Sequence, residues 1–538
     1  MGGVSVLRLC RCPCCDHRVS GLADLSREEL IALGYEQQAR IAELVTQNAA
    51  LTVAHEELVA QHAVLATAYE QLQSEHDGLA VKVAKLEHLL SRNSGNSSSP
   101  PSKDEDPGRT PPKRRDRSAS RRAKGKQKGA PGSFLSWSQT PDDQRDRFPT
   151  GACGCGRDLG GAADLGVVDS YQQTEIPVMR AAVTQFDQHA VRCGCGKVHT
   201  AARPDGARSG GAVGYGPTLA AWAVYLMVVH HLPTHRCRQV LEALTGARPS
   251  VGFVHGLLAR VGAALRTADA RIRTLITMAR VFCMDETPIR VGPKAPRPGR
   301  EKADRYLLIA CTNLYTHFLL GGRDLDTFKA SVLAEVAAGT VVVHDRYTVY
   351  DNPEFAGVVH QLCTAHLLRD LDDAAEVYPD AHWPGQIAQA LRGLVHAANT
   401  ARDGGQTRID PTVRADLLHT LRHGVLVGLA DTTGIGTRPG QRKARLLLEA
   451  FRDRPADILR FVDDLGVPPT SNAAERGLRP SKVQQNISGR LTSVTRTEDR
   501  YRILGYLTTA AKHGHDTMTV LLDVVLGRIW MPELPAVT

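Results

Sequence analysis

The stretches ARVFCMDETPIRV (residues 279–291) and AGTVVVHDRYTVYDN (residues 338–352) decide the fold. The first contains a short apolar, strand-like run followed by Asp285, and the second contains an apolar, β-branched run followed by Asp345. Such runs are typical of buried strands in a parallel-type sheet, and α/β folds place functional groups at the carboxyl ends of these strands. We therefore expect two buried strands that each end in a functional carboxylate.

The chain around these two stretches predicts the rest of an α/β domain. Candidate strands lie near Tyr306–Cys311 and Thr316–Leu320, and a helix is expected near Leu325–Ala338. The resulting order, strand–strand–strand–helix–strand, is that of an RNase H-like fold. From Val281 onward, strand-like and helix-like runs continue to alternate.

In an RNase H-like fold, a later helix packs across the sheet and supplies a third carboxylate. The stretch TSNAAERGLRPSKVQQNISGR (residues 470–490) fits this role. Ser471 or Asn472 would cap the helix, Glu475 lies one turn in, and Arg479 follows at i+4 on the same face. We expect Glu475 to join the two aspartates, and Arg479 to orient it or to touch a phosphate of bound DNA.

Asp285, Asp345 and Glu475 together predict a metal site. Three converging carboxylates can hold two Mg²⁺ or Mn²⁺ ions about 4 Å apart, one activating water or a DNA 3′-hydroxyl and the other stabilising the leaving oxygen. Taken singly, a strand-end aspartate is often a turn or cap residue, and a helical glutamate is usually solvated. Their joint fit to one fold favours the catalytic interpretation.

Three other acids compete for these roles: Glu286, Asp351 and Glu498. Glu286 is disfavoured because strand alternation points its side chain to the opposite face of the sheet from Asp285.

Length and charge indicate a multidomain protein with a polyanionic partner. A chain of 538 residues is too long for one core and predicts about three to five domains. The net charge is +9, and part of the excess lies in one cluster: Lys113, Arg114, Arg115, Arg117, Arg121, Arg122, Lys124, Lys126 and Lys128. Such a cluster suggests DNA contact that weakens as salt rises, with a solvated linker as the alternative.

Neither a membrane span nor a secretory signal is evident in the sequence. No stretch approaches the roughly 20 apolar residues that cross a bilayer. The opening residues carry two early arginines and four cysteines but no long apolar core. We therefore expect a cytoplasmic protein in which the twelve cysteines stay reduced, so that closely spaced pairs favour metal over disulfides.

A heptad repeat predicts a leucine-zipper coiled coil. A leucine recurs at every seventh position: Leu44, Leu51, Leu58, Leu65, Leu72, Leu79 and Leu86. These are d positions, and the a positions are unusually polar: Ile41, Asn48, His55, His62, Tyr69, His76 and Val83. Polar a residues fix register and oligomeric state at a cost in stability, so we expect a parallel homodimer. A long helix packed on its own protein is the alternative.

Two CGCG elements, residues 153–156 and 193–196, predict a structural zinc site. If a hairpin joins them, Cys153, Cys155, Cys193 and Cys195 would form a closed tetrahedral set, with glycines suited to the tight turns. The single residue between the two cysteines of each pair is less usual in zinc sites than two to four residues. His199 is a further candidate ligand. The alternative is that the cysteines stay reduced and bind no metal. A second cluster could bind another ion or belong to a translated upstream extension: Cys10, Cys12, Cys14, Cys15 and His17.

The segment after the second CGCG element predicts successive short helices. Pro233 opens one helix, Gly246 closes it, and Ser250 would cap the next. A helix–turn–helix would have this geometry, but its recognition helix shows only His255 and Arg260 as polar readers. An ordinary helical bundle is therefore the alternative.

Taken in order, these elements resemble the transposases of the insertion-sequence-sixty-six family of bacterial mobile elements. The resemblance covers nearly the whole chain and includes the leucine repeat, the cysteine pairs, SRNSGNSSSPPSKD (91–104) and HHLPTHRCRQVL (230–241). Its most specific motifs are MDETPIRV (284–291), HDRYTVYDN (344–352), CTAHLLRDL (363–371) and SNAAERGLRPSKVQQN (471–486). The chain departs from the family in its CGCG pairs, because the family more often has two residues between the cysteines.

The resemblance implies a DDE catalytic triad at Asp285, Asp345 and Glu475, with a helical insertion before the glutamate. Cys363 and His366 belong to a family signature, and either a metal role or packing in the core is open for them. The predicted segments are a cysteine-rich N-terminus (1–20), a coiled coil (21–91), a basic flexible linker (92–149), a zinc-finger-like module (150–205), a helical segment (206–278), the first part of the catalytic domain (279–365), the helical insertion (366–465), and the final part with a C-terminal tail (466–538).

The predicted function is therefore that of a DNA transposase in the bacterial nucleoid, which binds terminal inverted repeats, cleaves the element's end and transfers the strand to target DNA. Expected partners are DNA, a second copy of the chain, and accessory proteins of the same element. One alternative is a catalytically inactive DNA-binding regulator, against which the three acids argue. The other is an RNase H-like structure-specific nuclease, which has little need for a zipper, a tether and a zinc module together.

Overall fold

The computed structural model describes residues 25–91, 135–207, 211–293, 304–434 and 439–533. The cysteine cluster from Cys10 to His17 and the basic cluster from Lys113 to Lys128 lie outside these ranges, so the predictions for them stay predictions. The chain forms two units, residues 1–87 and 88–538, which are described separately. Within the described ranges, no helix is both long enough and apolar enough to span a membrane.

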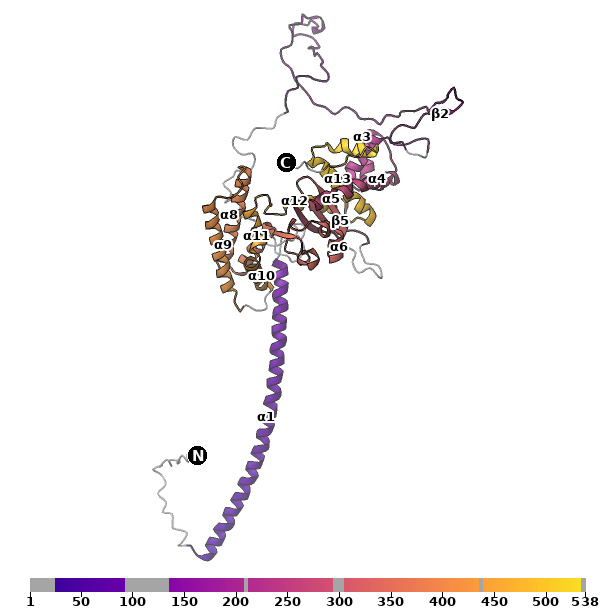
Figure 1. The fold of residues 1–538 in the computed structure, drawn as a ribbon. Helices are drawn as coiled ribbons and strands as arrows, with labels where there is room; N and C mark the ends of the chain where they lie inside the picture. Colours follow the sequence, from indigo (N-terminus) through magenta and orange to yellow (C-terminus); the bar gives the residue numbers. More distant parts are fainter. Residues whose placement is uncertain (1–24, 92–134, 208–210, 294–303, 435–438, 534–538) are drawn as a thin grey trace. The chain divides into compact units, whose positions relative to one another are not determined.

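The first unit is dominated by one helix, α1 (Arg27–Ser91), which is drawn in indigo to violet in Figure 1. It opens with a reciprocal capping box, in which the Glu29 N–H donates to Ser26 Oγ and the Ser26 N–H donates to the Glu29 carboxylate. All seven leucines of the heptad repeat are exposed, from 43% at Leu44 to 70% at Leu65. The helix confirms the predicted local structure, while its pairing with a second helix stays a prediction.

The second unit is built around a mixed five-stranded sheet with the strand order β5-β4-β3-β6-β7. The strands are β3 (Val281–Arg290), β4 (Asp304–Cys311), β5 (Thr316–Gly321), β6 (Val341–His344) and β7 (Val359–Leu362). β3, β4 and β5 pair antiparallel, whereas β6 pairs parallel with both β3 and β7. The chain is thus helix-rich with a mixed sheet, and the three central strands that the sequence predicts after Val281 are present.

The predicted helix near Leu325–Ala338 is shorter than expected. The structure has α6 (Leu325–Ala330) followed by a separate 3₁₀ turn (Val332–Glu335). Ser331 separates them with extended backbone, and its hydroxyl accepts a hydrogen bond from the Leu333 N–H. A serine at this point competes with the helix for backbone hydrogen bonds, which explains the break.

The prediction that Asp285 ends its strand was wrong, because Asp285 is the fifth residue of the ten in β3. The strand continues because β4 pairs with it as far as Arg290. Only the pairing with the shorter β6 stops early, at Cys283. Beyond that point no described strand pairs with the second edge of β3, so the missing N–H of Pro288 interrupts no ladder there.

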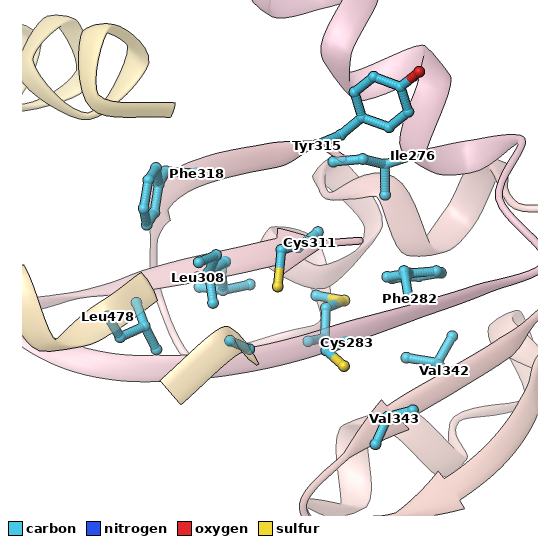
Figure 2. Close-up of a cluster of buried hydrophobic side chains, with 14 of the residues drawn as sticks. Ile276, Phe282, Cys283, Leu308, Cys311, Tyr315, Phe318, Val342, Val343 and Leu478 are labelled. Carbon is cyan, nitrogen blue, oxygen red and sulfur yellow. The ribbon is translucent and has the colours of Figure 1, made fainter. Parts of the chain in front are cut away.

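Apolar side chains from the central strands form the core around the site. Figure 2 shows Phe282 and Cys283 of β3, Leu308 of β4 and Val343 of β6 among these buried side chains, with Leu478 of a neighbouring helix. Residues that are direct cross-strand partners lie on the same face of a sheet. Because side chains alternate along each strand, they point to two opposite faces of the sheet, and Asp285 lies on one of these faces.

Helices cover both faces of this sheet. Tyr501 of α13 packs against Phe318 of β5, with ring centroids 5.5 Å apart, and on the other side of β5 His317 pairs with Asp269 of α5 at 3.0 Å. The helices that share this core are α2 (Pro217–Val228), α3 (Thr234–Thr245), α4 (Val251–Ala264), α5 (Arg266–Thr277), α13 (Val494–Lys512) and α14 (Thr517–Val525).

The predicted limits of α3 and α4 are confirmed. Gly246 ends α3 in the left-handed conformation at φ 74°, and the Ser250 hydroxyl caps α4 by accepting from the Phe253 N–H. The two helices form a helix–turn–helix in the geometric sense, but α4 packs tightly on α13: a Cβ at Gly262 would lie 2.6 Å from the Asp499 carboxylate. The segment is thus part of the common core, and its reading of DNA stays a prediction.

A set of helices separates β7 from the helix that carries Glu475. They are α7 (Thr364–Val377), α8 (Trp383–Asp403), α9 (Pro411–Asp431), α10 (Pro439–Asp453) and α11 (Pro455–Asp463), and α8 and α9 lie side by side (Figure 1). These helices occupy the stretch in which the sequence predicts a helical insertion. They are followed by α12 (Asn472–Ser488), with Ser471 at the N-cap position as predicted.

Candidate active site

Asp285 and Asp345 lie at the same level on neighbouring parallel strands. Cys283 of β3 is the register partner of Val343 of β6, and each aspartate lies two residues beyond this pair. Neighbouring strands are about 4.8 Å apart, and residues two positions apart share a face. The strand register therefore brings the first two predicted carboxylates together on one face of the sheet.

The electrostatics of Asp285 reflect this crowding. Burial raises the pKa of Asp285 to about 8; His366 opposes the shift, while the nearby charges of Glu286 and Asp345 add to it. One Asp285 oxygen accepts the Glu286 N–H at 2.9 Å. A carboxyl group that resists ionisation beside a second carboxylate is a place where a cation would be strongly favoured.

Asp345 is oriented by the turn that follows β6. Its Oδ1 accepts a hydrogen bond from the Tyr347 N–H at 2.9 Å, and its Oδ2 lies 3.7 Å from the guanidinium of Arg323. Arg323 is itself fixed, because it stacks over the Tyr347 ring at 4.0 Å and the Tyr347 hydroxyl donates to the Arg323 carbonyl oxygen at 2.8 Å. Sequence reasoning missed Arg323 and Tyr347, since no motif in the loop after β5 signals this long-range contact.

Glu286 belongs to a buried network that shares Arg323 with Asp345. Its side chain is only 2% exposed and pairs with Arg323 at 2.7 Å, while the Tyr350 hydroxyl donates to it at 3.4 Å. Burial raises the pKa of Glu286 to about 7; Asp345 adds to the rise and Arg323 opposes it. Tyr350 in turn stacks on His344, with ring centroids 3.9 Å apart, so Glu286 faces this aromatic pair.

The other two rival acids lie apart from the aspartate pair. Asp351 forms an ion pair with Arg454 at 2.9 Å. Glu498 is exposed on α13. Neither has a contact with Asp285 or Asp345 among the described residues.

Glu475 lies in the first turn of α12, about one third exposed. Two arginines flank its carboxylate: Arg369 of α7 at 3.6 Å, and Arg479 at the predicted i+4 position at 3.4 Å. Because Arg369 and Arg479 approach different oxygens, the carboxylate is held between α7 and its own helix.

Contacts between α12 and the sheet place Glu475 close to the level of Asp285. A Cβ at Gly477 would lie 2.3 Å from Ile309 Cδ1, and Ile309 is the cross-strand partner of Asp285. Further along, the Lys482 ammonium donates to the Pro288 carbonyl oxygen at 2.9 Å. The step of seven residues from 475 to 482 advances about 10 Å along a helix. The step of three residues from 285 to 288 also advances about 10 Å along a strand. Glu475 therefore lies over the face that carries Asp285.

The CTAH signature also lies at this site. His366 is in the first turn of α7, and although burial lowers its pKa, the Cys363 thiol and the charges of Asp285 and Asp345 outweigh burial and raise it to about 9. For Cys363, burial raises the pKa, but hydrogen bonds with His366 and Ser471 outweigh it and lower the pKa to about 7. Both residues are close to the aspartates and largely buried, and the choice between a metal role and packing in the core stays a prediction.

The two CGCG elements form two turns of the same shape. In each turn the N–H of the first cysteine, Cys153 or Cys193, donates at 2.8 Å to the carbonyl oxygen four residues later. The last glycine donates back to that cysteine's carbonyl and has a φ of 87° at Gly156 and 88° at Gly196, which only glycine adopts without strain. All four cysteines are exposed, and hydrogen bonds from the second cysteine lower the pKa of the first in each pair.

No metal cluster is closed in the part of the chain that the structure describes. There, no three His, Cys, Asp or Glu side chains converge tightly enough to hold an ion. Each cysteine pair forms its own turn and the two pairs are not joined, while Glu475 has no direct contact with Asp285 or Asp345 within these residues.

Comparisons with known protein families agree with this arrangement. The family described as "Transposase IS66 family" matches residues 212–498, just over half of the chain, which includes both aspartates and Glu475. A family of unknown function matches residues 33–135, which include most of α1. None of the curated proteins matches the chain. The chain belongs to the IS66 family of transposases.

Proposed function

We propose that the protein is a DDE-type DNA transposase in which Asp285, Asp345 and Glu475 carry out metal-dependent cleavage and joining of DNA ends. The observation that carries the proposal is the register of β3 and β6, which sets the two aspartates at one level beneath the helix that bears Glu475. The family match supports the function of a transposase, and the proposal assigns its catalytic step to these three acids.

The strand order supports an RNase H-like catalytic domain. Three antiparallel strands are followed by two parallel strands on the other side of β3, and α12 lies across β3 and β4. The sequence predicts this fold from the order of its elements, and it expects the third acid on such a helix. The five helices between β7 and α12 would be the insertion of the family.

The donor set fits Mg²⁺ or Mn²⁺. These ions prefer carboxylate oxygens, and a divalent charge beside Asp285 would restore the ionised form that burial and its neighbours disfavour. Asp285 and Asp345 would be the principal ligands and Glu475 the completing one. When bound, two such ions supply activation of the attacking oxygen and stabilisation of the leaving oxygen.

The chain's own side chains prepare these ligands. The Tyr347 N–H fixes one oxygen of Asp345, and the other oxygen lies 3.7 Å from the Arg323 guanidinium. Arg369 and Arg479 hold Glu475 from two sides, and both guanidinium groups are suited to the phosphate oxygens of a DNA strand that enters beside it. Positioning and charge neutralisation would thus account for most of the catalysis.

The proposal is tested by strand cleavage and joining with the purified chain, Mg²⁺ or Mn²⁺, and labelled DNA that carries the inverted repeats flanking the gene. We expect nicking and joining at the repeat ends, dependent on the metal, and a loss of about 10³-fold or more in Glu475→Gln. The matched control is Glu498→Gln, an exposed glutamate on α13 that should leave both steps unchanged. Binding of the repeats without cleavage by wild type would favour the regulator, or a requirement for accessory proteins of the element, which would then be added. Cleavage without joining would favour the nuclease.

The two cysteine turns are proposed to close around one structural Zn²⁺. Each turn already presents its two sulfurs on one loop with a lowered pKa at Cys153 and Cys193, which favours the thiolate that zinc binds. We expect one zinc per chain by elemental analysis and its loss in Cys193→Ser, with retention in Cys237→Ser, whose thiol is buried elsewhere. A zinc content that Cys193→Ser leaves unchanged would contradict the site.

Outside the catalytic unit, we propose that α1 pairs with a second copy and that the basic segment from Lys113 to Lys128 helps to hold DNA. The exposed leucine stripe supports the first proposal, and the concentration of charge in the sequence supports the second.

A further inference from the structure

Cys363 lies where several elements of the candidate active site meet. It follows β7, immediately precedes α7, and is only 2% exposed. Its N–H donates to the His344 carbonyl oxygen at 2.7 Å, at the end of β6. Its sulfur accepts a hydrogen bond from the Ser471 N–H at 3.3 Å, at the start of α12. One buried residue therefore touches the ends of two elements that each carry a candidate ligand.

Both contacts are close to those ligands along the chain. His344 is the residue before Asp345, and Ser471 is the N-cap of α12, with its carbonyl oxygen accepting the Glu475 N–H at 3.0 Å. The Cys363 backbone thus holds the chain next to Asp345, and the Cys363 side chain holds the turn that contains Glu475. A neighbouring bond from the Thr364 N–H to the Pro469 carbonyl oxygen, at 3.0 Å, reinforces the same junction.

The sulfur does more than fill space at this junction. Ser471 is 1% exposed, and its N–H precedes the first helical hydrogen bonds of α12. A buried N–H without a partner is destabilising, and within the described residues the Ser471 N–H donates its hydrogen bond to the Cys363 sulfur. The hydroxyl of Ser471 forms no capping bond, so the start of α12 depends on a partner from outside the helix.

We propose that Cys363 is a positioning residue that fixes the start of α12, and hence Glu475, relative to Asp345. The inference rests on the proposed function, because it gives Cys363 a role in assembling that set of carboxylates. Replacement of the acceptor would let the first turn of α12 shift or fray, which separates Glu475 from the two aspartates. Groups that orient metal ligands in this way typically change metal affinity by about 10- to 100-fold when they are lost.

The test compares the full-length wild type with Cys363→Ala, Cys363→Ser and Cys237→Ala. Cys237 is the matched control: it is a fully buried cysteine in α3, and its thiol donates to the Ala223 carbonyl oxygen at 3.5 Å. Both alanine variants create a cavity of similar size, so loss of packing alone should affect them equally. Cys363→Ser keeps an acceptor at the junction and serves if Cys363→Ala fails to fold.

Two readouts apply to these proteins. Hydrogen exchange of the metal-free protein should show faster exchange at the start of α12 in Cys363→Ala, and unchanged exchange there in Cys237→Ala. Mn²⁺ binding, followed by the loss of the free-ion electron paramagnetic resonance signal, should weaken about tenfold or more in Cys363→Ala, hardly at all in Cys237→Ala, and less in Cys363→Ser than in Cys363→Ala.

The outcomes separate the positioning role from the proposed function. If wild type binds Mn²⁺ and Cys363→Ala retains both that affinity and the exchange pattern of α12, the positioning role is overturned while the carboxylate site stands. Equal weakening in Cys237→Ala would also overturn it, because packing alone would then explain the effect. If wild type binds no Mn²⁺ at all, the proposed metal site fails, and the role of Cys363 in assembling it fails with it.

Discussion

Asp285→Asn is expected to abolish strand cleavage and joining, by about 10³-fold or more, while binding to the terminal repeats stays close to wild type. The side chains have nearly the same shape, so the sheet should persist, but the amide removes the charge that attracts the cations. The measurement is cleavage of labelled repeat DNA beside an electrophoretic binding assay. A comparable loss of cleavage and binding would contradict the role of Asp285, because the aspartate would then be needed for DNA capture or for folding.

The same substitution has a second, independent signature in the stability of the metal-free protein. An unfolded aspartate loses its proton near pH 3.8, whereas folded Asp285 retains it up to about pH 8, chiefly because it is buried. Between these values the folded state binds more protons, so the contribution of Asp285 to stability falls as the pH rises. At pH 8 without metal, Asp285→Asn should therefore melt at a higher temperature than wild type. Each kcal/mol recovered would correspond to about 1 to 2 °C in a unit of this size.

Added Mg²⁺ should reverse this order of stability. The ions bind only the folded carboxylate site, so they raise the melting temperature of wild type and have little effect on Asp285→Asn. The melting curves of wild type and Asp285→Asn are compared at pH 5 and pH 8. At each pH they are measured without MgCl₂ and then with MgCl₂ concentrations that increase in 10-fold steps. A pH-independent difference between the two proteins would show that Asp285 is ionised throughout and that its burial has no electrostatic consequence.

The second large effect is expected in the oligomeric state. Leu58→Glu combined with Leu65→Glu should convert a dimer into a monomer of 58.3 kDa, because it places like charges in adjacent layers of the seam. Both leucines are exposed on α1, at 64% and 70%, so the single chain gives them no packing to lose. Sedimentation equilibrium of the full chain at several concentrations measures the mass directly.

The control for this experiment puts the same two charges on the opposite side of α1. Ala60→Glu with Thr67→Glu occupies f positions of the repeat, two residues beyond each mutated leucine. This variant should remain dimeric. A dimer that survives the leucine substitutions, or that both variants lose equally, would place the contact between copies elsewhere in the chain.

Much of the catalytic unit could be predicted from the sequence because its main elements have strong local patterns. The β-branched runs before Asp285 and Asp345 specify buried strands, and the Ser471–Glu475 stretch has the cap and the acid of a helix start. The i+4 pair of Glu475 and Arg479 follows directly from helical spacing. These features depend on residues close together in the chain, so periodicity alone reveals them.

The remaining features of the fold and of the candidate site could not be predicted, because they depend on contacts between segments that are far apart in the sequence. β7 contains His360 and Gln361, which do not resemble a strand core. The buried side chain of Gln361 is hydrogen-bonded to α11, because its amide donates to the Ile458 carbonyl oxygen and its oxygen accepts the Phe461 N–H. The extension of β3 through Pro288 was not predicted, since a proline is excluded from a strand that is paired on both sides. Arg323 could not be assigned to the site at all, because Glu286 and Asp345 meet it only in the folded sheet.

The position of Asp285 within β3, not at its end, would give the three proposed ligands unequal rigidity. Hydrogen bonds to β4 fix the backbone on both sides of Asp285 as soon as the sheet forms. Asp345 follows the last residue of β6, and Glu475 sits in the first turn of its helix, so fewer regular backbone hydrogen bonds hold the chain at these two positions. Asp285 is thus preorganised when the sheet folds. The conformational entropy lost on binding of ions and DNA would therefore be lost mainly by Asp345 and Glu475. Substrate DNA that orders the start of α12 would therefore also raise the affinity of the site for the ions. Recognition of the DNA end would in this way be coupled to metal binding.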